Sequence, residues 1–237
     1  MCGRFALVEP VPEISRLFGV AVRDLDDWLE SAARYNIAPQ SDVLVVRGGE
    51  GGGRAGGLMR WGLVPAWARE ASVGARMFNA RLEGVRQRPA YRSAFARRRC
   101  LVPASAFYEW RRADEGGRGR QPFALRSRAR RPLALAAIWE ANTRILGGDV
   151  LRTVAVMTTA ARGVVATLHD RMPLILPEEA WTAWLDGQTP PDAVDAIAGQ
   201  AAEAGADDLE LYAVTPRMNS ARFEDPLCLE PVPQTAL

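Results

Sequence analysis

Residues 100–110 read Cys-Leu-Val-Pro-Ala-Ser-Ala-Phe-Tyr-Glu-Trp, and this stretch decides the fold class of the chain. Its two apolar runs, 100–103 and 106–110, are divided by small residues, as expected for two short strands in succession. Further strand-like runs lie at residues 43–47, 58–64, 122–127, 133–139 and 151–158. Because the strands follow one another without alternating with helices, we predict an antiparallel α+β fold.

Short helices are predicted at residues 12–18, 24–31, 162–168, 177–186 and 192–203. Pro12 fits the first turn of a helix, and the acids after Pro177 fit a helix start. The glycine-rich stretch Gly48–Gly57 predicts a hairpin loop, and residues 113–121 predict a second, polar loop. No Pro- or Ser-rich linker divides the 237 residues, so we predict one domain over residues 1–237.

The chain begins Met1-Cys2-Gly3-Arg4 and contains no lysine, since all 30 basic residues are arginine. Removal of Met1 would leave Cys2 with a thiol beside the only primary amine of the chain. An α-amine titrates near pH ~8 and a lysine near ~10.4, so the terminal amine is far more often unprotonated at neutral pH. Such an aminothiol forms an imine with an aldehyde and then closes a thiazolidine ring. Taken alone, a cysteine at position 2 can also be an ordinary residue without chemistry.

Charge is distributed unevenly along the chain, although the formal net charge is only +2. Residues 81–131 hold fifteen arginines and four acids, which gives +11, whereas residues 178–237 hold two arginines and twelve acids, which gives −10. A basic middle and an acidic end predict a polyanion-binding face and an opposite face that repels polyanions. The alternative is a solvated surface in a protein of arginine-rich composition.

The three cysteines, Cys2, Cys100 and Cys228, form no CxxC pair, which argues against a disulfide framework and a zinc site. The sequence has neither a signal-peptide pattern at its start nor an apolar run of ~18 residues. We therefore expect a cytoplasmic protein in a reducing setting, where the Cys2 thiol stays free. No cluster of residues suggests a metal or an organic cofactor.

Three side chains are candidates for proton transfer and substrate orientation. His169, the only histidine, could move protons at neutral pH. Strand alternation puts Glu109 on one face with Phe107, where desolvation would raise the pKa of its carboxyl group. Asn79 can both donate and accept hydrogen bonds, and beside Arg81 it could orient a substrate oxygen next to a phosphate. The alternatives are a surface histidine, a glutamate paired with an arginine and a loop asparagine.

Two further segments, residues 35–39 and 60–67, look like strands and turns that bear exposed aromatic side chains. Aromatic rings beside arginines suit stacking on unpaired bases, which is worth ~1–3 kcal/mol per base. Core packing explains Trp61 at least as well. It explains Trp67 less well, because Trp67 lies in the turn-like sequence Pro-Ala-Trp-Ala.

Six short motifs occur in order along the chain: Met-Cys-Gly-Arg-Phe at 1–5, Tyr-Asn-Ile-Ala-Pro at 35–39, Trp-Gly-Leu-Val-Pro at 61–65, Asn-Ala-Arg at 79–81, Arg-Cys-Leu-Val-Pro-Ala at 99–104 with Phe-Tyr-Glu-Trp at 107–110, and His-Asp-Arg-Met-Pro at 169–173. In this combination the chain resembles the SOS response-associated peptidase family, the abasic-site processing proteins. The resemblance runs from residue 2 to about residue 176, with a looser match through the C-terminal helices and 214–219.

The resemblance implies a single α+β domain with an antiparallel, β-barrel-like core flanked by short helices. It implies that Met1 is removed and that Cys2 captures the ring-opened aldehyde of an abasic site in single-stranded DNA. The product would be a thiazolidine DNA–protein crosslink, a lyase-like reaction in the DNA damage response. The implied catalytic residues are Cys2, Asn79, Glu109 and His169, and the implied DNA-binding residues are Arg4, Trp67, Arg81 and Arg171.

We further expect a monomer without membrane or cofactor partners, which is cytoplasmic and associates with the nucleoid when bound to DNA. Contacts in the Gly48–Gly57 loop and in residues 111–121 cannot be transferred, because the chain departs from the family there. Two other functions stay open. One is an N-terminal-cysteine hydrolase or peptidase whose α-amine serves as the base for the thiol and which removes its own Met1. The other is a single-strand binding module without covalent chemistry.

Overall fold

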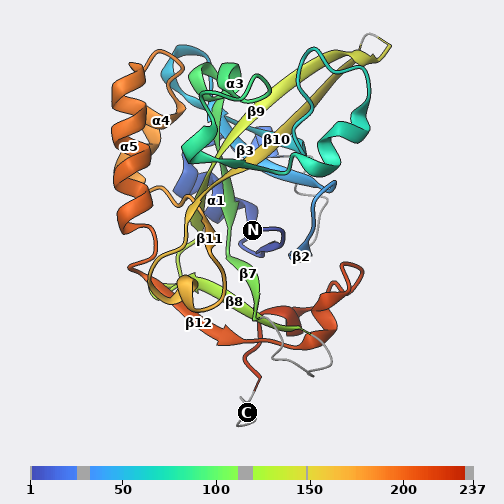
Figure 1. The fold of residues 1–237 in the computed structure, drawn as a ribbon, viewed down its shortest axis with the longest axis vertical. Helices are drawn as coiled ribbons and strands as arrows, with labels where there is room; N and C mark the ends of the chain where they lie inside the picture. Colours follow the sequence, from blue (N-terminus) through green and yellow to red (C-terminus); the bar gives the residue numbers. More distant parts are fainter. Residues whose placement is uncertain (1, 26–32, 112–119, 148, 233–237) are drawn as a thin grey trace.

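The computed structural model describes residues 2–25, 33–111, 120–147 and 149–232, and two sheets form its framework (Figure 1). Five strands close into a ring: β10 (Asp149–Ala160), β4 (Arg54–Trp61), β3 (Asp42–Gly48), β6 (Arg99–Ala104) and β9 (Leu133–Leu146). The ring closes because β9 pairs with β6 on one side and with β10 on the other. Two three-residue strands, β5 (Asn79–Arg81) and β11 (Arg171–Pro173), also pair with β10.

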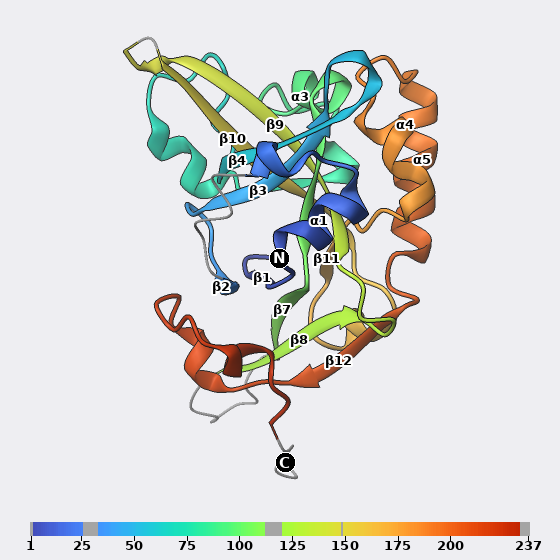
Figure 2. The same ribbon diagram turned by 180° about the vertical axis from the view of Figure 1, so that it is seen from behind.

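The second sheet is antiparallel throughout and lies below the barrel in Figure 1. Its strands, in spatial order, are β12 (Leu209–Ala213), β8 (Gln121–Ser127), β7 (Ala106–Arg111), β1 (Phe5–Leu7) and β2 (Arg34–Ile37). The start of the chain lies in the middle of the molecule in both views, beside β7 (Figures 1 and 2). This arrangement brings the residues that follow Met1 against the junction of the two sheets.

Short helices cover the outside of the barrel: α1 (Val11–Phe18), α3 (Arg92–Arg97), α4 (Trp181–Leu185) and α5 (Pro191–Ala204). Single 3₁₀ turns occur at Val22–Leu25, Glu50–Gly52, Ala71–Arg76, Leu82–Gly84, Gly163–Thr167, Glu178–Ala180, Pro216–Asn219 and Pro226–Leu229. Gly19 ends α1 in the left-handed conformation, with φ of 64°, a conformation that glycine adopts without steric cost. No helix in the described ranges is long and apolar enough to cross a bilayer.

The predicted α+β class and the barrel-like antiparallel core are confirmed, and each predicted strand is present. One detail differs: β10 runs parallel to β4 and to β5. The predicted helix at 162–168 is only a 3₁₀ turn at Gly163–Thr167, and of the predicted helix at 24–31, residues 26–31 lie outside the described residues. The glycine-rich stretch is shorter as a loop than predicted, because β4 already begins at Arg54. Most of the predicted loop at 113–121 lies outside the described residues.

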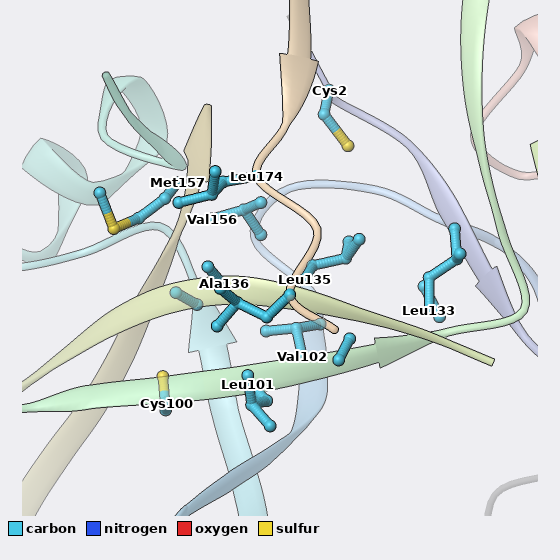
Figure 3. Packing of buried hydrophobic residues seen from close by; sticks show 14 of the residues in the cluster. Cys2, Cys100, Leu101, Val102, Leu133, Leu135, Ala136, Val156, Met157 and Leu174 are labelled. Atoms are coloured by element: carbon cyan, nitrogen blue, oxygen red, sulfur yellow. The ribbon is translucent and has the colours of Figure 1, made fainter. Parts of the chain in front are cut away.

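One large buried cluster contains residues from both sheets, such as Phe5 and Phe107 from one sheet and Val45 and Leu101 from the other. Cys2 belongs to this cluster, and Figure 3 shows it with labelled residues of β6, β9 and β10. Trp61 is fully buried and is therefore a core residue, as the packing alternative required. A second, smaller cluster contains Tyr108 and lies on the opposite face of β7.

The two charged regions of the sequence are not separated in space as predicted. Several arginines of the basic middle form ion pairs with acids of the C-terminal region: Arg86 with Asp195 at 2.9 Å, Arg126 with Glu210 at 2.7 Å, Arg130 with Glu210 at 3.2 Å and Arg131 with Glu178 at 3.2 Å. The prediction of one basic and one opposite acidic face is therefore wrong for this part of the surface. Sequence charge counts could not show it, because the partners lie up to 109 positions apart.

Candidate active site

Cys2 is held in place from both sheets. It lies three residues before the start of β1, whose Phe5 pairs with Phe107 on β7 and with Ile37 on β2. The Cys2 carbonyl oxygen accepts a hydrogen bond of 2.8 Å from Nδ2 of Asn79. Asn79 begins β5, which is anchored to the barrel through its pairing with β10. The predicted nucleophile and the predicted orienting asparagine are thus in direct contact.

Glu109 provides a buried carboxyl group close to Cys2. Its side chain comes from β7, next to β1, and the residue is only 3% exposed. The pKa of Glu109 is raised to about 7, mainly by burial and to a smaller extent by the negative charge of Asp170. This confirms that Glu109 is desolvated, as its place among aromatic residues predicts. A carboxyl group with this pKa can accept and release protons at neutral pH.

The Cys2 thiol is fully buried. Burial raises the pKa of this thiol to about 12, and the negative charge of Glu109 contributes to the increase. The thiol is therefore neutral in this arrangement and requires a base when it reacts. The pairing of Phe5 with Phe107, and the hydrogen bond of 3.0 Å from the Tyr108 N–H to the Arg4 carbonyl oxygen, bring Glu109 of β7 alongside the segment that contains Cys2.

His169 lies in the segment that leads into β11, next to Asp170. Its Nδ1 atom accepts a hydrogen bond of 2.9 Å from the backbone N–H of Arg171. The same Nδ1 lies 2.8 Å from a carboxylate oxygen of Asp170. One ring nitrogen cannot accept from an N–H and donate to a carboxylate at once, so the two contacts belong to different protonation states. The neutral imidazole accepts from Arg171, and an imidazole that carries a proton on Nδ1 pairs with Asp170.

Asn79 has an unused hydrogen-bond acceptor. Its Oδ1 atom is buried and has no hydrogen-bond partner among the described residues. The backbone around it is fixed, since Tyr91 donates its hydroxyl to the Asn79 carbonyl oxygen at 3.2 Å. Buried polar atoms in native proteins nearly always have a partner, so an orphaned acceptor beside a reactive group is a candidate contact for a substrate hydroxyl.

Arg4 lines a cavity of about 390 Å³ together with Gly3, Trp110, Arg120 and Asn219. Its Nη1 donates to Oδ1 of Asn36 at 2.7 Å and to the Met218 carbonyl oxygen at 3.0 Å. Its guanidinium lies 5.7 Å from the centroid of the Trp110 ring. Arg4 is thus held rigidly at the wall of an open cavity, as a phosphate-binding arginine would be.

The sequence analysis did not single out the residues that hold Arg4. Asn36 is 1% exposed, and its Nδ2 donates to the carbonyl oxygens of Ser220 at 3.0 Å and Phe223 at 2.8 Å. Glu224 accepts from the backbone N–H groups of Tyr35 and Asn36. The only available signal was a polar asparagine within the strand-like Tyr-Asn-Ile segment, since its partners come from the far end of the chain.

The remaining predicted DNA-binding residues differ in exposure. Trp67 is 60% exposed and Arg81 is exposed as well, so both are accessible to a ligand. Arg171, in contrast, forms a bidentate ion pair with Glu83, at 2.6 and 2.9 Å, and also donates to the Thr158 carbonyl oxygen at 2.7 Å. This pairing lowers the pKa of Glu83. Arg171 would have to exchange Glu83 for a phosphate, and its role in DNA binding stays a prediction.

Comparison with known proteins identifies the family. A model of the family "SOS response associated peptidase (SRAP)" matches residues 1–221. The chain belongs to the SRAP family. It is 33% identical over 235 residues to the abasic site processing protein YoqW of Bacillus subtilis (strain 168), with 97% of this chain and 99% of YoqW covered. It is 29% identical over 273 residues to the abasic site processing protein HMCES of Gallus gallus, and the match covers 98% of this chain and 78% of HMCES.

Two solved structures share the fold of this chain. A protein from Bacteroides thetaiotaomicron superposes with a TM-score of 0.83 at 16% identity, covering 98% of this chain and 100% of that protein. A phage-related protein from Bordetella bronchiseptica superposes with a TM-score of 0.67 at 25% identity, covering 90% of this chain and 94% of that protein.

Proposed function

We propose that this SRAP protein captures abasic sites in single-stranded DNA through Cys2 once Met1 has been removed. The product is a thiazolidine that links the protein covalently to the DNA. The observation that carries the proposal is the convergence on the Cys2 segment of Asn79, which binds the Cys2 carbonyl oxygen at 2.8 Å, and of the buried carboxyl group of Glu109, whose strand β7 pairs with β1. The curated relatives named as abasic site processing proteins support the choice of substrate.

The reaction proceeds in two bond-forming steps. The Cys2 α-amine adds to C1′ of the ring-opened sugar, and loss of one water leaves an imine. The Cys2 sulfur then adds to the same carbon, and the thiol proton ends on the nitrogen, which closes the ring. Glu109 transfers protons in both steps, because its pKa of about 7 lets it act as acid and as base. Oδ1 of Asn79 accepts from a sugar hydroxyl, and His169 moves a proton at the sugar oxygens as the ring opens.

Loss of Met1 is required in this proposal, because it creates the Cys2 α-amine that forms the imine. The next residue, Gly3, lines the cavity of about 390 Å³ that also holds Arg4. This cavity offers the baseless sugar and its flanking phosphates a route toward Cys2.

A denaturing gel tests the proposed function. The processed protein is incubated with single-stranded oligonucleotides that are either intact or contain one abasic site, and the mixture is then denatured. We expect a shifted band only in the sample that contains the abasic strand. Binding of both strands under native conditions without any band after denaturation would instead indicate a single-strand binding module. Cleavage of peptide or amide substrates in place of crosslinking would favour the hydrolase alternative, to which self-removal of Met1 also belongs.

Replacing Glu109 by glutamine is expected to slow crosslinking by about 100-fold, a typical effect of losing a general acid–base. In the wild-type protein the capture rate should rise as the pH passes through about 7, because the carboxylate that accepts protons forms there. The glutamine variant should lack this step in its pH profile. Single-turnover crosslinking between pH 5 and 9 measures both effects. Native binding of an intact single strand serves as control, and equal loss of binding and capture would point to misfolding and contradict a catalytic role.

Replacing Trp67 by alanine is expected to weaken binding of single-stranded DNA by about 5- to 150-fold, which corresponds to the ~1–3 kcal/mol of one base–aromatic stack. Since Trp67 is 60% exposed, the melting temperature should stay nearly unchanged. Fluorescence anisotropy of a labelled strand measures the affinity. The matched variant Trp67→Phe keeps an aromatic face and should retain most of it. If the alanine variant and the wild-type protein bound the strand with equal affinity, Trp67 would have no role in DNA binding.

A further inference from the structure

The hairpin between β3 and β4 borders a second cavity, of about 360 Å³, whose lining is strongly basic. Figure 2 shows this hairpin turning beside α4, away from the start of the chain. Four arginines line the cavity, namely Arg47, Arg54, Arg97 and Arg99, and the one acid in its lining is Asp186. None of these residues belongs to the Cys2 site. Glycines of the Gly48–Gly57 stretch also line the cavity, and the proposed function gives them no role.

Arg99 brings a buried positive charge to this cavity. The residue is 2% exposed, and its guanidinium donates to backbone carbonyl oxygens: Trp184 at 2.8 Å, Phe95 at 2.9 Å, Ala96 at 2.5 Å and also Asp186. Carbonyl groups orient the guanidinium but do not neutralise it. Burial lowers the pKa of Arg99, and the charge of Asp186 offsets only part of this effect, since the two side chains form no ion pair within the described residues. Burying a charge is costly, and an anion in the adjoining cavity would reduce this cost.

Arg47 and Arg97 have donors available for such an anion. Arg97 is exposed, and its side chain makes neither a hydrogen bond nor an ion pair within the described ranges. The one hydrogen bond found for the Arg47 side chain there is a long one, 3.5 Å to the Gly48 carbonyl oxygen. Its guanidinium lies 6.0 Å from the centroid of the Trp139 ring, which also lines the cavity. Arg54 is already engaged by the Phe18 carbonyl oxygen at 2.9 Å and by Thr182 Oγ1 at 3.2 Å.

The glycines of the hairpin set the course of the loop that borders the cavity. Gly51 and Gly52 have φ of 67° and 81°, and a Cβ at either position would meet no other atom within 4 Å. Glycine is therefore required there by the backbone conformation and not by tight packing. At Gly48, in contrast, a Cβ would come within 2.7 Å of the Leu185 carbonyl oxygen, so this end of the hairpin is fixed against α4. The result is an anchored loop that presents bare backbone to the cavity.

We propose that this cavity binds the phosphate group of a nucleotide, either free or within a single strand. Arg47 and Arg97 would pair with the phosphate, because planar guanidinium groups match its oxygens in a bidentate manner. Trp139 supplies an aromatic wall for the attached sugar or base. The volume lies within the range of about 300–1,000 Å³ that is typical of small-molecule sites and exceeds what a bare anion needs. The site does not depend on the crosslinking reaction.

Isothermal titration of the Cys2→Ala variant tests this proposal, because no covalent product can form through the thiol. The probes are dAMP, inorganic phosphate and a short oligothymidylate without an abasic site. We expect dAMP to bind more tightly than inorganic phosphate. We also expect Arg47→Ala and Arg97→Ala each to lower the affinity for dAMP about tenfold, the effect of one lost charge-assisted hydrogen bond. Arg92→Ala is the matched control, since Arg92 is exposed on the same helix, α3, but does not line the cavity.

The oligothymidylate distinguishes the two sources of the phosphate. If the site accepts a strand, Arg97→Ala should also weaken binding of the oligonucleotide. If the site takes free nucleotides, only the binding of dAMP should be affected. Both results support the cavity as a phosphate site. Unchanged dAMP affinity in Arg47→Ala and Arg97→Ala, or an equal loss in Arg92→Ala, would overturn it. Failure of the abasic crosslink in the wild-type protein would leave this titration unaffected, so the two proposals can fail separately.

Discussion

Replacing Cys2 by alanine is expected to abolish the heat-stable crosslink to abasic single-stranded DNA. The variant keeps an α-amine after removal of Met1, so it can still form an imine with the aldehyde. It lacks the sulfur that closes the ring, and an imine is hydrolysed on heating. Reduction with borohydride before heating should therefore rescue a covalent product. Denaturing gels with and without borohydride, each with and without heating, measure the difference.

The control for this experiment is Cys100→Ala, which removes another fully buried thiol from the same protein. Cys100 lies in β6 of the barrel, opposite Arg47 of β3, so its loss should leave the crosslink intact. Mass spectrometry of each variant establishes whether Met1 has been removed. A heat-stable adduct with processed Cys2→Ala protein would refute the thiazolidine. If only the Cys2→Ala variant retained Met1, this would instead show that Cys2 takes part in the removal of Met1.

The local pattern around Glu109 could be predicted from the sequence, because strand alternation extends over only a few residues. Phe107 and Tyr108 fall into different buried clusters, as a period of two requires. The same pattern predicted that Glu109 shares the face of Phe107, inside the protein, and its burial follows. The contact between Cys2 and Asn79 was not accessible in this way, since it joins residues 77 positions apart. Only the family resemblance placed both in one site.

Short strands and long-range polar contacts explain most of what the sequence did not show. The strands β1, β5 and β11 have three residues each, too few for a recognisable period, and they form because longer partners pair with them. The state of Arg171 could not be predicted either. Its Glu83 partner is 88 positions away, so a motif that marks Arg171 as a phosphate ligand says nothing about the carboxylate that holds it here.

Replacing Trp61 by alanine is expected to destabilise the protein by about 3–5 kcal/mol, the usual cost of removing a large buried aromatic side chain. Trp61 is fully buried, its ring lies edge-to-face with Phe5 at 5.1 Å and with Phe78 at 6.0 Å, and its Nε1 donates to the Phe78 carbonyl oxygen at 2.8 Å. A loss of this size is a large share of the ~5–15 kcal/mol that stabilises a typical domain. Urea denaturation followed by circular dichroism measures the change in the free energy of unfolding.

This substitution also tests how the core supports the site, because the two rings that contact Trp61 adjoin the reactive residues. Phe5 lies three residues after Cys2 in β1, and Phe78 directly precedes Asn79. Trp61→Ala should therefore slow crosslinking even at temperatures where the variant remains folded. The variant Trp61→Phe keeps a ring and loses the N–H donor, while the Phe78 carbonyl oxygen still accepts from the Val156 N–H at 3.0 Å. It should therefore cost only about 0.5–1.5 kcal/mol, the net contribution of one hydrogen bond. An alanine variant that is destabilised as expected but reacts at the wild-type rate would show that Cys2 and Asn79 are positioned independently of Trp61.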